Sequence, residues 1–247
     1  MTALFISDLH LDGSRPEISQ LFLEFLEQQA VRASALYILG DFFEVWTGDD
    51  DDDIHHLRVM TGLKALTATG VPVYLMHGNR DFLIGERFAQ RTGVQLLADP
   101  TVIELGGSPT LLMHGDTLCT DDVQYQRARR LLRNPLVRSL YLALPLSLRR
   151  RIAAYARAKS RTDTAAKAAY IMDVNQRAVE AAMTDHGVTR LIHGHTHRPT
   201  VHRFKSADGK PMERIVLGDW HDQPSVLKWD GDAGMLSDRR VADGKAD

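Results

Sequence analysis

Short apolar runs alternate with longer amphipathic stretches through the first half of the chain. Three runs have the length of a buried strand and end on polar residues: ALFISD at residues 3–8, ALYILGD at 35–41 and VPVYLMHGN at 71–79. Three stretches that follow them carry apolar residues at helical spacing: residues 21–31, 54–69 and 82–91. This alternation predicts an α/β fold in which helices cover a sheet of mixed parallel and antiparallel strands.

The pattern changes after a predicted hairpin at residues 101–116. Residues 121–185 are almost entirely helical in composition, with interruptions at Asn134-Pro135 and Pro145. Predicted strands return before a polar tail that we expect to be irregular from Asp230 onward: residues 190–197, 200–220 and 224–230. We therefore expect one domain formed by residues 1–120 and 186–247, with residues 121–185 as a helical insertion that caps it.

Length and composition are those of a soluble globular protein. The chain has 247 residues, of which 44% are hydrophobic and 25% charged, enough for one large core. Its one cysteine, Cys119, excludes an intrachain disulfide and is predicted to be a buried thiol rather than a nucleophile. The N-terminal residues do not resemble a signal peptide, and no apolar run reaches the roughly 20 residues of a membrane-spanning helix, so we expect a cytoplasmic protein.

Charge is distributed unevenly along the chain. Residues 123–161 contain 11 Lys or Arg and no Asp or Glu, whereas the remainder carries 19 basic and 32 acidic residues. Nucleic-acid binding explains this charge but not the many aliphatic residues among the arginines, so we expect no nucleic-acid partner. A helical lid that touches lipid chains and anionic headgroups explains both features. A helical pair packed on the core with a solvated basic face explains them equally well.

Residues that can bind a metal follow five of the predicted strands. They are Asp8-x-His10, Gly40-Asp41, Gly78-Asn79, His114-Gly115 and Gly194-His195-Thr196-His197. Strand ends are where an α/β sheet presents side chains to a ligand, and an adjoining glycine permits a sharp turn and close approach. Oxygen and imidazole ligands without thiolate suit Mn²⁺, Fe²⁺ or Zn²⁺ better than Ca²⁺. A carboxylate such as Asp41 can bridge two ions, which is the usual arrangement for displacement at phosphorus.

An arginine stands between two of the polar residues in MHGNRD at 76–81. Cleavage of a phosphoester expels an alkoxide, which benefits from a general acid. Cleavage of a pyrophosphate expels a phosphate, for which a permanent, bidentate cation such as Arg80 is better suited. The stretch therefore favours P–O–P cleavage. In the alternative interpretation, Arg80 is a surface residue paired with Asp81.

The ordered set of motifs is similar to that of the calcineurin-like metallophosphoesterases, over about residues 3–120 and 188–230. This resemblance implies a β-sandwich flanked by helices and two metal ions. It assigns one ion to Asp8, His10, Asp41 and His197, and the other to Asp41, Asn79, His114 and His195. Glu44 stands where many members have Asp, and we expect it to begin a helix and support the ligands.

Further stretches narrow the resemblance. LGDFFEVWTGDDD, GNRDFLIG, MHGDTLCTDD and YIMDVNQRAV resemble the family of UDP-2,3-diacylglucosamine pyrophosphohydrolases of lipid A synthesis. That family implies water attack on the α-phosphorus, giving UMP and a diacylglucosamine 1-phosphate (lipid X), with two Mn²⁺ ions and an insertion that holds the acyl chains. It also implies a peripheral protein on the cytoplasmic side of the inner membrane, which we expect to be a monomer.

The same resemblance implies contacts with the lipidated UDP-sugar substrate, and among these Asn79, Arg80 and His195 are expected to act in catalysis. The predicted contacts are Asn79, Arg80, Asp122, Ser160, Thr164, Lys167 and His195. On the residues alone, Ser160 is as well explained as a helix N-cap and Lys167 as a solvated lysine.

Two other functions remain open at this point. One is a phosphodiesterase of the same fold, acting on cyclic nucleotides or nucleic acid. The other is a non-catalytic scaffold that uses the basic insertion to bind a membrane or partner. Outside the motifs, we expect the five aspartates at 49–53 to form a solvated loop and Trp220-His221 to be a buried structural pair.

Overall fold

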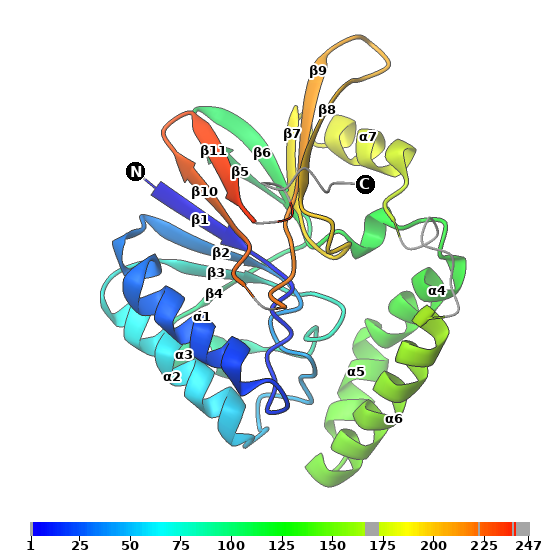
Figure 1. Cartoon of the computed structure of the whole chain (residues 1–247). Coiled ribbons are helices and arrows are strands. Elements are labelled where there is room, and N and C mark those ends of the chain that lie inside the picture. Colours follow the sequence, from blue (N-terminus) through cyan, green and yellow to red (C-terminus); the bar gives the residue numbers. More distant parts are fainter. Residues whose placement is uncertain (1, 166–172, 222, 239, 241–247) are drawn as a thin grey trace.

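Two β-sheets stack between layers of helices in the computed structural model, which describes residues 2–165, 173–221, 223–238 and 240 (Figure 1). The first sheet has the order β11-β10-β1-β2-β3-β4 and the second β5-β6-β7-β9-β8. The strands of the first sheet are β1 (Thr2–Ile6), β2 (Ala35–Leu39), β3 (Val73–Met76), β4 (Gln95–Leu97), β10 (Val226–Asp230) and β11 (Ala233–Ser237). Those of the second are β5 (Thr101–Leu105), β6 (Ser108–Met113), β7 (Arg190–His193), β8 (Thr200–Lys205) and β9 (Pro211–Val216).

Strand direction brings the predicted ligand-bearing ends together. Strands β1, β2 and β3 are parallel, and their register places Ile6 beside Ile38 and Ile38 beside Leu75. In the second sheet β6 and β7 are also parallel, with Met113 beside His193. Because these parallel strands end level with one another, the polar residues that follow leave each sheet at one edge.

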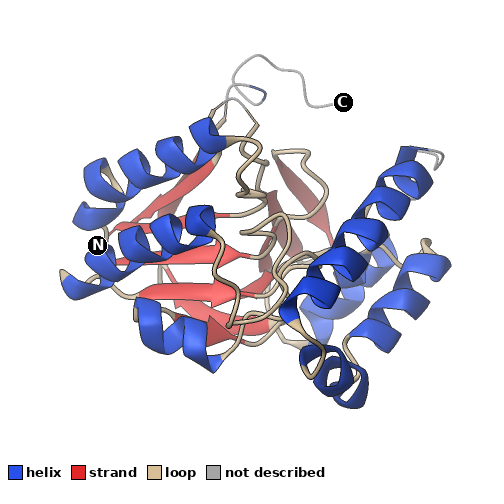
Figure 2. Cartoon of the chain, turned by 90° about the horizontal axis from the view of Figure 1, so that it is seen from below, coloured by secondary structure: helices blue, strands red, loops and turns tan. Residues whose placement is uncertain are grey.

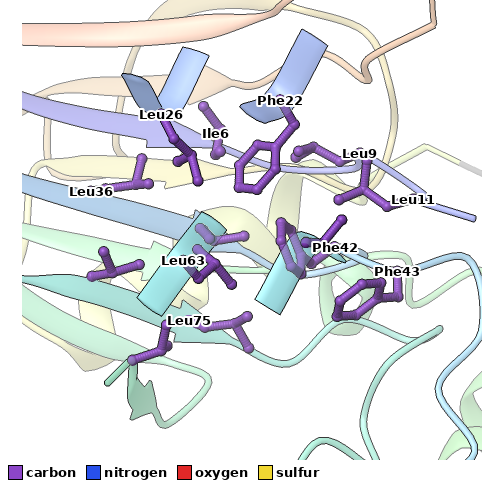
Figure 3. Close-up of a cluster of buried hydrophobic side chains, with 14 of the residues drawn as sticks. Ile6, Leu9, Leu11, Phe22, Leu26, Leu36, Phe42, Phe43, Leu63 and Leu75 are labelled. Carbon is purple, nitrogen blue, oxygen red and sulfur yellow. The ribbon is translucent and has the colours of Figure 1, made fainter. Parts of the chain in front are cut away.

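Helices α1 (Pro16–Gln28), α2 (Ile54–Ala68) and α3 (Glu86–Thr92) cover the outer face of the first sheet. Phe22 of α1 and Leu63 of α2 are fully buried against the sheet, as Figure 3 shows. A second cluster lies between the sheets and includes Phe5, Met76 and Ile192. Alternation along each strand sends successive side chains to these two opposite cores.

Three helices stand beside the sandwich and are called the cap here: α4 (Val123–Leu132), α5 (Pro135–Leu142) and α6 (Leu146–Ala165) (Figures 1 and 2). The predicted interruption at Asn134-Pro135 begins α5, because Asn134 caps the helix and Pro135 occupies its first turn. Helix α7 (Gln176–Asp185) instead buries Val179 and Met183 against the second sheet. The division at 121–185 stays a prediction, and the packing of α7 favours a shorter insertion.

The predicted α/β sandwich flanked by helices is confirmed. Two edge strands, β4 and β11, were not predicted. The expectation of an irregular tail after Asp230 is wrong for Ala233–Ser237, which turns at Gly231 and pairs with β10. These two strands have no fully buried residue, so their sequences lack the apolar alternation that marks the predicted ones. No helix in the described residues is long and apolar enough to cross a membrane.

Candidate metal centre

Backbone conformation marks the predicted ligands as a group. Five of them have φ between 50° and 70°: Asp8, His10, Asp41, His195 and His197. They are the only non-glycine residues with positive φ in the part of the chain that the structure describes. Left-handed backbone is costly for residues with a Cβ and gathers at functional sites, so the turns after β1, β2 and β7 are shaped for the side chains they carry.

Two glycines permit the close approach that the sequence predicts. A Cβ at Gly78 would lie 2.1 Å from the backbone nitrogen of Asp41, and one at Gly194 would lie 2.3 Å from an oxygen of Asp8. Both distances are far below contact, so neither position accepts a side chain without displacing a predicted ligand.

One group of side chains joins Asp8, His10 and His197, whose potential ligand atoms all lie within 4.8 Å of one another. The Nε2 atoms of His10 and His197 face each other at 3.3 Å, and Asp8 Oδ1 lies 3.4 Å from His197 Nε2. Asp8 Oδ1 is buried and accepts no hydrogen bond from any described residue. A buried carboxylate oxygen that lacks a hydrogen bond and lies beside two converging imidazole nitrogens fits a divalent cation.

A second group joins Asp41, His114 and His195 by the same criterion. The Asn79 carboxamide adds a fourth member, because the side-chain atom that faces the group lies 3.0 Å from both His114 Nε2 and His195 Nδ1. Asp41 lies between the two groups: Oδ1 is 3.7 Å from His114 Nε2, and Oδ2 is 3.9 Å from His10 Nε2. The structure thus brings all seven predicted ligands together, with Asp41 in the position of a bridge.

Neighbouring groups orient these side chains. Asp8 Oδ2 accepts from Ser7 Oγ at 2.6 Å and from the His195 amide at 2.8 Å, so Oδ1 is turned to the metal site. The other ring nitrogen of His114 lies 2.9 Å from the Leu39 carbonyl, which fixes its ring. Such contacts select the imidazole tautomer that can bind a metal.

Two further acids contact predicted ligands. His197 Nδ1 lies 3.6 Å from Asp219, which was not predicted, although it follows strand β9 in a Gly-Asp pattern like that of Asp41. Glu44 lies 3.1 Å from His10 Nδ1, as its predicted supporting role requires. It begins no helix, because the next helix starts only at Ile54. The loop from Asp41 to Asp53 is held by contacts across the chain that the local sequence does not reveal.

The electrostatic balance of the site favours cations. Burial opposes a charge on His114, yet the carboxylates of Asp41, Asp116 and Asp8 raise its pKa to about 9. Burial, together with the neighbouring His114, lowers the pKa of His195 to about 4. Metal ligands must be deprotonated, so an arriving cation would displace a proton from His114 while the surrounding carboxylates compensate its charge.

Arg80 points into this site rather than toward Asp81. Its Nε lies 3.8 Å from Asp41 Oδ2. Asp81 is fully buried and accepts from the Phe42 and Gly78 amides, both at 2.7 Å. The alternative interpretation of Arg80 as a surface residue paired with Asp81 is therefore wrong. Asp81 instead fixes the loops that carry Asp41 and Asn79.

The other predicted substrate contacts lie on or next to the cap. Asp122 caps α4 by accepting from the Tyr125 amide at 3.0 Å. Ser160 is half-buried within α6, well past its start, so its interpretation as an N-cap is wrong. Thr164 lies in the last turn of α6, where side chains are not described, and Lys167 lies outside the described residues.

Most of the aspartates at 49–53 are structural, contrary to the expected solvated loop. Asp51 is 5% exposed, and Asp49 accepts from the amides of Gly85 and Phe88, both at 3.0 Å, at the start of α3. Asp53 caps α2 by accepting from the His55 amide at 2.8 Å. Arginines of α6 contact the loop as well, since Arg149 donates to Asp50.

Several arginines of the basic segment at residues 123–161 form internal ion pairs. Arg149, Arg150 and Arg157 of α6 contact acids of residues 44–52, while Arg129 and Arg133 approach Asp116. At the same time, nine large apolar side chains of residues 123–155 are exposed: Val123, Leu131, Leu132, Leu136, Leu140, Leu142, Leu148, Ile152 and Tyr155. The cap therefore presents more exposed apolar surface, and less unpaired positive charge, than its composition implies.

Two other predictions concern isolated residues. The Cys119 thiol is buried, as predicted, and burial raises its pKa to about 12, which does not suit a nucleophile. Trp220 is buried but His221 is exposed, so the expected buried pair is wrong for the histidine.

Comparison with known proteins agrees with this geometry. A model of the family "Calcineurin-like phosphoesterase" matches residues 1–199. The UDP-2,3-diacylglucosamine hydrolase of Serratia proteamaculans is 52% identical and covers 96% of this chain and 98% of that protein. The proteins of the same name from Nitrosococcus oceani and Pseudomonas paraeruginosa are 52% and 53% identical and cover 98% and 93% of this chain. By family model and by relatives alike, the chain belongs to the calcineurin-like phosphoesterases.

Proposed function

We propose that this protein hydrolyses the pyrophosphate of UDP-2,3-diacylglucosamine to UMP and 2,3-diacylglucosamine 1-phosphate, a step of lipid A biosynthesis. The observation that carries the proposal is the identity of about half of all residues, over nearly the full length of both chains, with relatives named for hydrolysis of this compound. The seven clustered donor side chains and Arg80 support it independently, because they suit phosphorus chemistry.

Two divalent ions fit the donor set, and Mn²⁺ is the proposed metal. Asp8, His10, Asp41 and His197 would hold one ion, and Asp41, Asn79, His114 and His195 the other. When bound, such ions lower the pKa of water and neutralise phosphoryl charge. The oxygen donors of Asp8, Asp41 and Asn79, with no thiolate among the predicted ligands, support a hard ion such as Mn²⁺.

Arg80 neutralises charge on the phosphate oxygens as the P–O–P bond breaks. Its side chain is 22% exposed beside Asp41, so a substrate can reach the guanidinium without a rearrangement of the core. A guanidinium stays charged at every physiological pH and offers two parallel donors to a phosphate. Asn79 and His195, which line the same group, orient the phosphoryl oxygens at the α-phosphorus.

The cap holds the lipid part of the substrate. Asp122 and Ser160, with Thr164 and Lys167 beyond them in the chain, contact the glucosamine headgroup, and apolar side chains of the cap receive the acyl chains. The support is the position of α6, whose Arg157 reaches Glu44 next to the predicted metal site. Exposed leucines near arginines also suit the cytoplasmic face of the inner membrane, where a monomer would bind peripherally.

The experiment is Mn²⁺-dependent hydrolysis of UDP-2,3-diacylglucosamine in mixed micelles in ¹⁸O water, with UDP-N-acetylglucosamine as the unacylated control. Release of ¹⁸O-labelled UMP from the lipid substrate alone is expected. Label in the sugar phosphate instead would place the attack on the other phosphorus. Equal cleavage of both compounds would show that the cap does not recognise the acyl chains. No cleavage of either by metal-loaded protein would overturn the function and favour phosphodiester substrates.

Membrane association is tested separately, by sedimentation with vesicles of neutral or partly anionic phospholipid. Binding to anionic vesicles that weakens with added salt is expected. Retention of the protein in the supernatant with both vesicle types would restrict the cap to substrate binding.

A further inference from the structure

Helix α4 contacts the rest of the molecule mainly through polar side chains. None of its ten residues, all within the described structure, is buried, so apolar packing does not fix its position. Polar contacts do so instead, and most of them converge on a single residue, Asp116. Asp116 lies two residues after His114, beyond the left-handed turn at Gly115, and its side chain is fully buried.

Three residues of α4 bind Asp116. Its Oδ2 accepts from Tyr125 Oη and from Arg129 Nε, both at 2.6 Å, and its carbonyl accepts from Gln126 Nε2 at 2.8 Å. Tyr125 and Arg129 are four residues apart and so lie on one face of the helix. An oxygen of Asp99, whose side chain is 5% exposed, lies 4.0 Å from Arg129 Nη2. The guanidinium is thus held between two buried carboxylates.

The same face of α4 continues to the other side of the site. Arg133, one turn beyond Arg129, donates to the Gly78 carbonyl at 2.8 Å, next to Asn79 and Arg80. The ring of Tyr125 lies 6.1 Å from the His195 ring, at an angle of 32°. The face of α4 that carries Tyr125, extended by the C-cap residue Arg133, therefore spans the predicted metal group from His195 to the loop of Arg80.

From this arrangement we infer that Asp116 is a positioning residue that joins the cap to the metal centre. It sets α4, through Tyr125 and Arg129, at the distance from His195 and Arg80 that the reaction requires. Because Asp116 leaves strand β6 by the same turn as His114, the cap takes its position from the element that carries a predicted ligand. The inference rests on the proposed function for its catalytic consequence, but not for the docking of α4.

The test compares Tyr125→Phe, Arg129→Gln and the double variant with the metal-loaded parent protein. Each single variant removes one donor to Asp116 and keeps most of the side chain. Hydrogen exchange of the α4 amides is expected to accelerate at least threefold. Turnover of the acylated UDP-sugar is expected to fall about tenfold to a hundredfold, as for misplacement by about 1 Å. Metal content stays at the parental value.

Asp116→Asn removes the charge and one acceptor oxygen, so it is expected to accelerate α4 exchange and lower turnover in the same direction as the double variant. Tyr125 and Arg129 share the acceptor Oδ2 of Asp116, so their contributions to the position of α4 are coupled. If Asp116→Asn does not fold, the single and double variants carry the test, since the same coupling predicts less than additive losses for the double. Arg130→Gln is the matched control, an exposed arginine on the same helix, and leaves exchange and turnover unchanged.

Lower turnover without faster hydrogen exchange of the α4 amides would overturn the inference, because Tyr125 or Arg129 would then act on the substrate directly. Unchanged exchange and unchanged turnover in both single variants would overturn it as well. Hydrogen exchange of the α4 amides and metal content are both measured without substrate. A parent protein that cleaves no acylated UDP-sugar therefore refutes the proposed function, while the exchange data still decide whether Asp116 fixes α4.

Discussion

Oε2 of Glu44 lies 3.1 Å from Nδ1 of His10, the ring nitrogen that faces away from His197. The other oxygen of Glu44 accepts from Arg157 of α6. A carboxylate in this position fixes the imidazole and raises its basicity toward a metal. Glu44 thereby connects the cap to the first group of predicted ligands, as Asp116 connects it to the second.

Glu44→Gln is expected to weaken binding of one metal ion by about 10- to 100-fold, the usual cost of removing such a partner. Metal titration followed by elemental analysis measures this directly. Glu27→Gln, an exposed acid on α1, is the control. An unchanged affinity for both ions would show that Glu44 serves only to hold Arg157.

Asp41→Ala removes the side chain that lies between both groups of ligands. Bound metal is expected to fall well below two ions per chain. Activity falls at least about 10³-fold, the upper range for loss of a single charge-stabilising contact. Asp52→Asn, whose side chain is 77% exposed, keeps the parental metal content. Two tightly bound ions in Asp41→Ala would contradict the bridging position.

Arg80→Ala is expected to lower kcat by about 10²- to 10³-fold with metal content near normal. In the proposed function its guanidinium contributes charge to the reaction and does not bind metal. Arg80→Lys keeps the charge but loses the planar fork, so it recovers only part of the rate. Steady-state kinetics and metal analysis are made on the same preparations. An Arg80→Ala protein that is purified without metal would disprove the catalytic role.

Arg149 is 2% exposed and donates to the carbonyls of Thr47 and Leu144 as well as to Asp50. Arg149→Met leaves buried acceptors without donors and is expected to lower the free energy of unfolding by about 1–3 kcal/mol. Urea denaturation measures the change. Arg151→Met, at an exposed position of the same helix, provides the comparison and should unfold like the parent.

His56 packs against Phe43 and Trp46, and burial lowers its pKa below the usual value near 6.5. As the pH falls through 6.5, the unfolded chain gains a proton at this position that the folded chain does not. His56 therefore lowers stability progressively on acidification, by at most about 1.4 kcal/mol per pH unit. His56→Phe is expected to reduce the slope of unfolding free energy against pH between 7 and 5. A parental slope in His56→Phe would contradict the assignment.

The clustering of the seven predicted ligands could be foreseen because each follows an apolar run, and parallel strands in register end at one edge. Asp81 and Asp116 could not. Asp81 accepts from the Phe42 amide 39 residues away, and Asp116 accepts from a phenol and a guanidinium of the cap. Nothing in a local pattern shows which distant donor a buried carboxylate will meet. The edge strands β4 and β11 escaped prediction because they have no fully buried residue to leave a periodic signal.

The left-handed residues of the predicted metal site imply a conflict between the stability of the fold and its function. Each such conformation costs about 1–2 kcal/mol in a residue with a Cβ, so five of them cost about as much as the whole net stability of many domains. Glycine at Asp8, His10, Asp41, His195 or His197 would remove that cost together with the ligand. Such substitutions would stabilise the fold but remove the predicted ligands. Selection for thermal stability alone would therefore eliminate the site.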